Sequence, residues 1–145
     1  MDFGEYSYFN LCCAVTRLGF CLQRSSDDFL QTKLGIGFAQ LKLMIVINKN
    51  LSLEQNNLAK FLGQTEASIS RQIKIMKSSG LINIAKDAKD SRKKFISLTG
   101  QGRVLLGESV KLLDKFHADF LSSISEKDRT FLQSIIDKLI TNYSG

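Results

Sequence analysis

The sequence contains no proline and only three cysteines, and each shortage excludes a class of structure. Without proline, no residue of the chain breaks a helix by removing a backbone N–H. Cys12, Cys13 and Cys21 have no C-x-x-C spacing, so neither a zinc knuckle nor a disulfide framework fits. No apolar run reaches the roughly eighteen residues of a membrane-spanning helix, so we expect no membrane association.

Signatures of catalysis are also lacking. His117 is the single histidine, and neither a nucleophile motif nor a second histidine accompanies it. The run that begins at Gly100 has Leu105 where the third glycine of a dinucleotide-binding fingerprint belongs, and the phosphate-binding motif G-x-x-x-x-G-K-[ST] is absent. We therefore expect no enzyme activity, no cofactor and no metal site.

The remaining composition indicates one cytoplasmic globular domain. The first residues, MDFGEYSYF, are acidic and aromatic, which is the wrong charge for a secretory signal. An odd number of cysteines agrees with a reducing compartment. With 145 residues, 43% of them hydrophobic, the chain is long enough to bury a core of its own.

Positive charge is concentrated in one stretch of the chain. Residues 65–94 hold eight basic and three acidic side chains, which is +5 of the total net charge of +6. Seven of the nine positions from Lys86 to Lys94 are charged. Such a concentration is typical of proteins that bind a phosphate backbone, and the alternative is a merely solvated face.

The hydrophobic pattern predicts helices over most of the chain. Residues 5–23 and 36–48 are apolar on more than one face, which indicates buried helices. Ser52 and Gln55 have the spacing of a capping box at the start of the next helix, and Gly63 is the predicted end of that helix. Thr65 is the predicted N-cap of a further helix that ends at Gly80.

Two helices joined by so short a turn predict a helix-turn-helix unit. The buried positions of its second helix are predicted to be Ile69, Ile73 and Met76. The opposite face, at about 100° per residue, consists of Ala67, Arg71, Lys74 and Ser78, flanked by Ser68 and Ser70. Small, hydroxylic and cationic residues suit close approach to a major groove, and the alternative is a surface helix kept soluble by its charges. Gln64 and Gln72 stand where apolar residues are commoner.

After Gly80 the apolar period changes to two, which predicts strands over residues 82–85 and 95–98. They form a hairpin whose tip, residues 89–92, can reach a DNA backbone or minor groove. Asp90 is expected to hold the guanidinium group of Arg92 rather than to contact DNA. The alternative is a solvated hairpin whose lysines protect an exposed edge strand.

In this order, the elements resemble the multiple-antibiotic-resistance-regulator (MarR) family of winged helix-turn-helix transcription factors. The matching motifs are L-A-x-x-L-G at residues 58–63, S-x-S-R at 68–71, G-L-I at 80–82, D-x-R at 90–92 and L-T-x-x-G at 98–102. With weaker motifs the resemblance extends from about Gly35 to Tyr143.

The resemblance implies a mainly α fold with a small antiparallel β wing, in a single domain over residues 1–145. Residues 36–99 form the winged DNA-binding unit, and residues 1–34 and 100–145 supply dimerisation helices. It further implies a homodimer that binds pseudo-palindromic double-stranded DNA and, by analogy, acts as a repressor. The contacts that the family implies are Thr65, Ala67, Ser68, Ser70, Arg71 and, in the wing, Arg92. Charge and position add Lys74, Lys89 and Lys93.

The apolar positions of the C-terminal helices support a partner subunit independently. They exceed what a compact winged domain covers, although a larger single core is the alternative. These positions are Val104, Leu105, Leu112, Leu113, Phe116, Phe120, Phe131, Ile135, Leu139 and Ile140.

How the protein is controlled is less evident. Many members of the family release DNA when a small, often phenolic, molecule binds, but no polar constellation identifies such a site here. Cys13 lies about where hydroperoxide-sensing members have their reactive thiol, and Arg17, one helical turn away, can stabilise a thiolate. The tyrosines that surround that thiol in such sensors are replaced by Arg17, Asp27 and Phe38. Two alternatives remain open, a thiol-based redox sensor and a winged-helix module for protein interaction.

Overall fold

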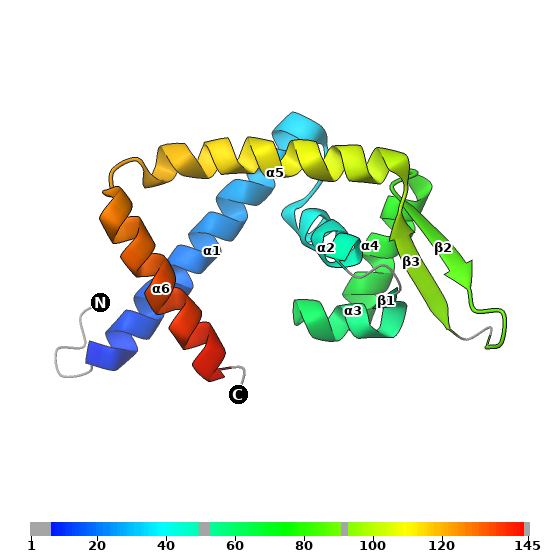
Figure 1. Cartoon of the computed structure of the whole chain (residues 1–145), viewed down its shortest axis with the longest axis horizontal. Helices are drawn as coiled ribbons and strands as arrows, with labels where there is room; N and C mark the ends of the chain where they lie inside the picture. The colour runs from blue at the N-terminus through cyan, green and yellow to red at the C-terminus, as the bar shows by residue number, and fades with distance from the viewer. Residues whose placement is uncertain (1–6, 50–52, 91–92, 144–145) are drawn as a thin grey trace. The chain divides into compact units, whose positions relative to one another are not determined.

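The computed structural model describes residues 7–49, 53–90 and 93–143 (Figure 1). Its helices are α1 (Ser7–Leu34), α2 (Phe38–Lys49), α3 (Gln55–Leu62), α4 (Glu66–Ser78), α5 (Gly100–Leu121) and α6 (Glu126–Tyr143). Its strands are β1 (Leu53–Glu54), β2 (Ile82–Lys86) and β3 (Lys94–Leu98). The chain divides into two compact units, Met1–Val110 and Lys111–Gly145, and α5 begins in the first and continues into the second.

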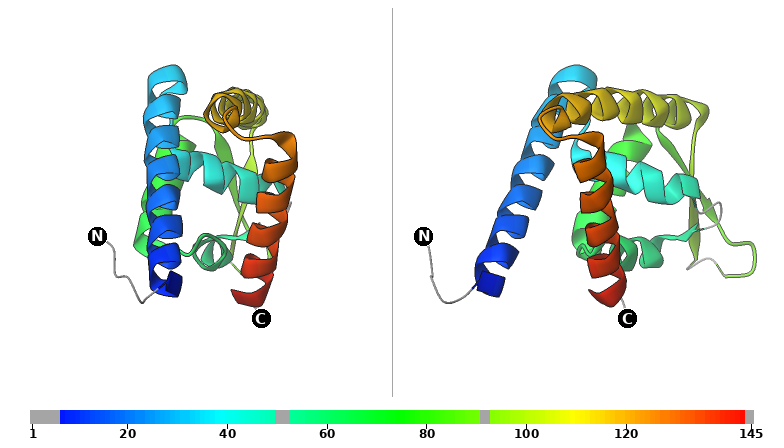
Figure 2. Two further views of the ribbon diagram at one scale, coloured as in Figure 1. Left: turned by 90° about the vertical axis from the view of Figure 1, so that its left-hand side faces the viewer. Right: turned by 60° about the vertical axis from the view of Figure 1, so that its left-hand side comes forward.

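The first unit is a winged helix-turn-helix. Its antiparallel sheet has the strand order β1-β3-β2, with Ile82 opposite Leu98 and Ile84 opposite Ile96. Helix α2 packs against β3 and α4 packs against β2, while the β2–β3 hairpin projects beyond the helices (Figures 1 and 2). The core between these elements is aliphatic. Its most deeply buried residues are Leu30, Leu41, Leu43, Met44, Ile47, Leu58, Ile69, Met76 and Ile96. This architecture confirms the predicted fold class.

The start of the helix before the turn was predicted wrongly. Leu53 and Glu54 do not begin a helix but form β1, which pairs with Ile96 and Phe95 of β3. Helix α3 begins only at Gln55. Ser52, the predicted cap, lies outside the described residues. Pairing with a strand about forty residues away overrides the local capping signal, and no periodicity within two residues can reveal it.

Helix α1 is longer and far more exposed than predicted. It extends to Leu34, where Gly35 ends it with a positive φ of 68°. Only Ser26 and Leu30 of the helix are buried, whereas Tyr8 is 87% and Leu11 60% exposed. Among the described residues, the apolar first half of α1 is therefore exposed rather than buried.

The second unit contains the end of α5 and the whole of α6. Ser125 caps α6: its hydroxyl accepts from the Asp128 backbone N–H at 3.1 Å and donates to the Asp128 carboxylate at 2.7 Å. No residue of α6 is buried. The apolar side chains of α6 are all exposed, and they are Phe131, Leu132, Ile135, Ile136, Leu139, Ile140 and Tyr143.

Among the described helices, none by itself is long and apolar enough to cross a membrane. Helices α1 and α2 meet the length and composition criteria only as a pair, which is bent by 87° at its break.

Candidate DNA interface

Both helices of the helix-turn-helix unit end at a glycine with a positive φ, 60° at Gly63 and 70° at Gly80. After α3, the Gln64 N–H donates to the Ala59 carbonyl at 3.1 Å and the Gly63 N–H donates to the Lys60 carbonyl at 3.3 Å. This is the Schellman pattern, which needs a left-handed residue and therefore favours glycine. The predicted ends of both helices are confirmed.

The start of α4 is fixed by a short hydrogen-bonded chain. Thr65 is the N-cap, with extended φ and ψ of −73° and 149°, and its Oγ1 accepts from the Ser68 N–H at 3.2 Å. The Ser68 hydroxyl donates to Oε1 of Gln64 at 3.3 Å. Gln64, a departure from the usual apolar pattern, thus orients a predicted DNA-contacting hydroxyl. The spacing of Gln64 and Ser68, four residues apart at the start of a helix, is the sequence signal that could have predicted this contact.

Helix α4 separates an apolar face from a cationic one, as predicted. Ile69, Ile73 and Met76 are buried. The predicted outer residues Ala67, Arg71, Lys74 and Ser78 are exposed, and Ser68 and Ser70 are half-buried at its edge. Within the described part of the chain, neither Arg71 nor Lys74 has an ion-pair or hydrogen-bond partner, so both cations are available to an anionic ligand. Ile75, 43% exposed, adds an apolar contact beside them.

The loop of the wing is held by Asp87, whose role was not predicted from the sequence. Oδ1 of Asp87 accepts from the backbone N–H groups of Lys89 at 2.7 Å and Asp90 at 3.0 Å. These bonds, that of Lys89 above all, hold the pKa of the Asp87 carboxyl below its ordinary value of 3.8, and the positive charge of Lys93 contributes. Aspartate favours turns because its carboxylate accepts a hydrogen bond from the backbone N–H two residues later. This preference is the sequence signal that could have predicted the role of Asp87.

Around Asp87 the loop is closed by backbone bonds and carries exposed cations. The Asp87 N–H donates to the Lys93 carbonyl and the Lys93 N–H donates to the Asp90 carbonyl, both at 3.0 Å. Lys89, Lys93 and Lys94 are exposed. Arg92 lies outside the described residues, so its predicted pairing with Asp90 stays a prediction.

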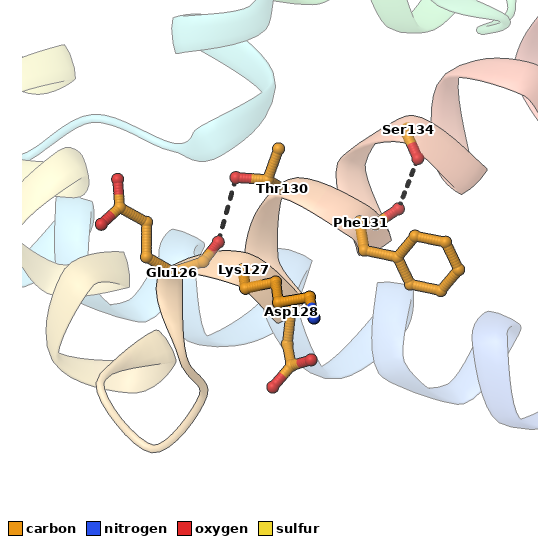
Figure 3. Close-up of a pocket in the computed structure, with 6 residues that line it drawn as sticks. All are labelled: Glu126, Lys127, Asp128, Thr130, Phe131 and Ser134. Atoms are coloured by element: carbon orange, nitrogen blue, oxygen red, sulfur yellow. Dashed lines mark hydrogen bonds between the residues drawn. The ribbon is translucent and has the colours of Figure 1, made fainter.

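Surface hollows are present on α6 and between α1 and α2. The larger, about 800 Å³, is lined by residues of α6 alone (Figure 3). Its hydroxyls bond their own helix, Thr130 to the Glu126 carbonyl at 3.0 Å and Ser134 to the Phe131 carbonyl at 2.7 Å. With the hydroxyls bound in this way and the ring of Phe131 exposed, this is an apolar helix surface rather than a polar binding site.

The smaller hollow, about 260 Å³, lies between α1 and α2. Its lining residues are Phe20, Gln23, Arg24, Asp27, Phe38 and Ala39. Oδ1 of Asp27 accepts from the backbone N–H of Phe38 at 2.7 Å, which fixes the start of α2 against α1. Two aromatic rings, a guanidinium, a carboxylate and an amide side chain thus line a space with room for more than one aromatic ring.

The cysteines and the histidine of the sequence lie on helices α1 and α5. Cys12, Cys13 and Cys21 are exposed free thiols along α1. The ring of His117 lies 5.6 Å from that of Phe116 in the second unit.

Comparison with known proteins finds no family model that matches the chain. It is 25% identical over 111 residues to YdgJ of Bacillus subtilis, an HTH-type transcriptional regulator, covering 77% of this chain and 68% of YdgJ. It is also 25% identical over 101 residues to the transcriptional regulator HosA of Escherichia coli, covering 70% of this chain and 75% of HosA.

Solved structures share the fold. The crystal structure of MarR superposes with a TM-score of 0.83 at 20% identity, over 90% of this chain and 97% of MarR. BldR of Sulfolobus solfataricus has a TM-score of 0.82 at 16% identity, and the match covers 98% of this chain and 99% of BldR. MepR of S. aureus in complex with DNA has a TM-score of 0.74 at 23% identity, and the match covers 94% of this chain and 97% of MepR. The comparisons confirm the resemblance to the MarR family: the chain has the winged helix-turn-helix fold of MarR and is a relative of HTH-type transcriptional regulators.

Proposed function

We propose that this protein is a transcriptional regulator that binds double-stranded DNA sequence-specifically. The observation that carries the proposal is the outer face of α4, where Arg71 and Lys74 are exposed beside small residues while the opposite face is buried. A helix of this kind enters a major groove without steric obstruction. The names of the relatives, transcriptional regulators and a DNA complex among them, support the same function.

The residues divide between base and backbone contacts. Ala67, Ser68 and Arg71 lie where α4 reaches base edges, and Arg71 suits guanine or a phosphate. The oxygen of the Thr65 hydroxyl accepts from the Ser68 N–H, so the hydroxyl can still donate its hydrogen to a phosphate. The remaining proposed contacts are Ser70 and Lys74 on α4 and Lys89, Arg92 and Lys93 in the wing. The wing cations contact the backbone or minor groove, with Asp90 restraining Arg92.

The proposed active form is a homodimer on a pseudo-palindromic operator. The first half of α1 and the apolar face of α6 are each exposed, and neither is a stable surface for a lone chain. A second copy covers such surfaces in a two-fold arrangement. Two recognition helices about one DNA turn apart, roughly 34 Å, then read two half-sites.

We further propose that the protein is a repressor and that a small aromatic effector releases it from DNA. The hollow between α1 and α2 offers Phe20 and Phe38 to a ring and Arg24 to an acidic substituent. Because α2 packs on α3 and α4, a ligand there acts on an element that supports the recognition helix. A regulator of this kind works where the chromosome is, and we accordingly place it in the cytoplasm.

The deciding experiment is a selection from random duplex DNA, followed by salt titration on the enriched site. We expect an inverted repeat whose affinity falls steeply with salt. Arg71→Ala should change base preference, whereas Lys89→Ala should weaken binding to all sequences and lower the salt slope by about one. No enrichment by an intact dimer under reducing conditions would contradict the proposal and favour the protein-interaction module.

A further inference from the structure

The turn that follows the recognition helix is bonded to the residue that precedes α5. The hydroxyl of Thr99 donates to the Gly80 carbonyl at 2.7 Å, and the backbone N–H of Thr99 donates to the Leu81 carbonyl at 3.0 Å. Gly80 and Leu81 are the residues whose N–H groups close the C-terminus of α4, by bonds of 3.0 and 2.9 Å to Lys77 and Met76. One side chain and one backbone group of Thr99 thus hold two successive carbonyls at the end of α4.

The same threonine begins α5. Its Oγ1 accepts from the Gly102 N–H at 3.0 Å, and its carbonyl accepts from the Arg103 N–H at 3.0 Å. The guanidinium of Arg103 donates to the Leu98 carbonyl at 2.9 Å, which ties the first turn of α5 to β3. Thr99 therefore serves two helices at once, closing the end of α4 and the start of α5.

A glycine lets the two elements come this close. Gly102 is buried, and a β-carbon at this position would overlap the carbonyl oxygen of Leu81, a backbone atom that cannot rotate away. At Gly100, two residues earlier in the same helix turn, a β-carbon would meet no atom within 4 Å. The close approach is thus specific to position 102, and the first turn of α5 lies directly on the turn after α4.

We infer that Thr99 and Gly102 form, with Gly80 and Leu81, a clamp that fixes the angle between the recognition helix and α5 and thereby determines which half-site spacing the dimer accepts. The inference rests on the proposed DNA-binding function. α5 is one helix from Gly100 to Leu121, so in a dimer joined outside the winged unit it links each recognition helix to the two-fold axis. Thr99 and Gly102 are positioning residues that do not contact DNA.

The test compares Thr99→Val and Gly102→Ala with Thr99→Ser and Gly100→Ala. Thr99→Val removes the hydroxyl bonds with little change of shape, whereas Thr99→Ser keeps them, and Gly100→Ala adds the same methyl group where there is room. Each dimer is titrated with the selected operator, with operators whose half-sites are one base pair closer or farther apart, and with a single half-site.

We expect wild type, Thr99→Ser and Gly100→Ala to prefer the selected spacing. In Thr99→Val and Gly102→Ala this preference should fall on the order of fivefold or more, while single half-site affinity and base preference stay unchanged. Unchanged spacing preference in Thr99→Val would overturn the inference and leave the proposed function intact, as would an equal loss of affinity for the single half-site, which indicates a merely structural role. If wild type enriches no site at all, the proposed function itself fails.

Discussion

At the scale of single residues, the base contact proposed for Ser68 depends on the direction of its hydroxyl. It is turned toward Oε1 of Gln64, so its oxygen lone pairs rather than its hydrogen face outward. In Gln64→Leu the hydroxyl can rotate and donate, which inverts what it offers to a base edge. We expect a shift of about 1 kcal/mol in discrimination at the base pair that Ser68 reads, measured by competition with substituted operators.

A matched control for this substitution is Ser78→Ala, on the same helix. The Ser78 hydroxyl bonds its own helix, at the Ile75 carbonyl, 2.8 Å away near the C-terminus of α4. Its removal should leave base preference as in wild type. An unaltered preference in Gln64→Leu would show that Ser68 does not read a base through this hydroxyl.

Asp87 gives the wing a pH dependence whose sign follows from its lowered pKa. The folded pKa lies below the ordinary value of 3.8, because the carboxylate accepts the N–H groups of Lys89 and Asp90. Its contribution to loop stability is therefore full above pH 3.8 and is lost as pH falls through the folded pKa. In Asp87→Ala, these two amides should exchange with solvent faster at neutral pH, as measured by hydrogen exchange in NMR spectra. Wild-type exchange rates in the variant would show that Asp87 does not stabilise the loop of the wing.

At the scale of elements, the glycine at the end of α3 fixes where the recognition helix begins. Gly63 has a φ of 60° with no atom near its missing β-carbon, so Gly63→Ala should cost only backbone strain, about 1 kcal/mol of unfolding free energy. Gly107→Ala, in the interior of α5 with equal space, should instead stabilise by about 0.5–1 kcal/mol. Urea unfolding measures the change in unfolding free energy of each variant. Equal changes in Gly63→Ala and Gly107→Ala would show that the positive φ at position 63 is not what makes alanine unfavourable there.

The elements that sequence predicted well are those whose signals are local. Alternating Ile82 and Ile84 predicted β2, and the buried spacing of Ile69, Ile73 and Met76 predicted α4, because both faces are set by periods within the segment. β1 was missed because two residues have no period, and its existence depends on β3. The continuation of α1 to Leu34 was missed because it is polar and has no apolar period. One of its residues, Asp27, instead accepts from the Phe38 N–H at the start of the next helix.

In the candidate site, both the predicted and the missed roles depend on partners that are near in sequence. Thr65 was predicted as a cap and is one, since capping depends on the four successive residues from Thr65 to Ser68. The two roles found only in the structure belong to Gln64 and Asp87, whose partners are likewise near in sequence. Neither role follows from the cations and hydroxyls that indicate DNA contact, because Gln64 and Asp87 act by orienting other groups.

At the scale of the whole molecule, apolar and cationic surfaces belong to different parts of the chain. Residues 65–94 carry most of the net charge, while exposed large apolar side chains are concentrated on α1, α5 and α6. Charged patches steer a protein to DNA, and uncovered apolar helix faces drive association between subunits. The separation predicts that substitutions can impair the proposed dimerisation and the proposed DNA contact independently.

Leu139→Glu tests this independence on α6. Leu139 is 57% exposed at the centre of the apolar face, so a carboxylate there costs a lone chain little, but burying it in a subunit interface without a partner is expensive. We expect a concentration-dependent loss of dimer in sedimentation, with helix content retained and operator affinity reduced to that of a single half-site. Thr141→Glu adds the same charge on the opposite face of α6 and should remain dimeric. A dimer of wild-type stability in Leu139→Glu would exclude this face from the interface and leave the exposed apolar side chains of α1 and α5 for a second copy to cover.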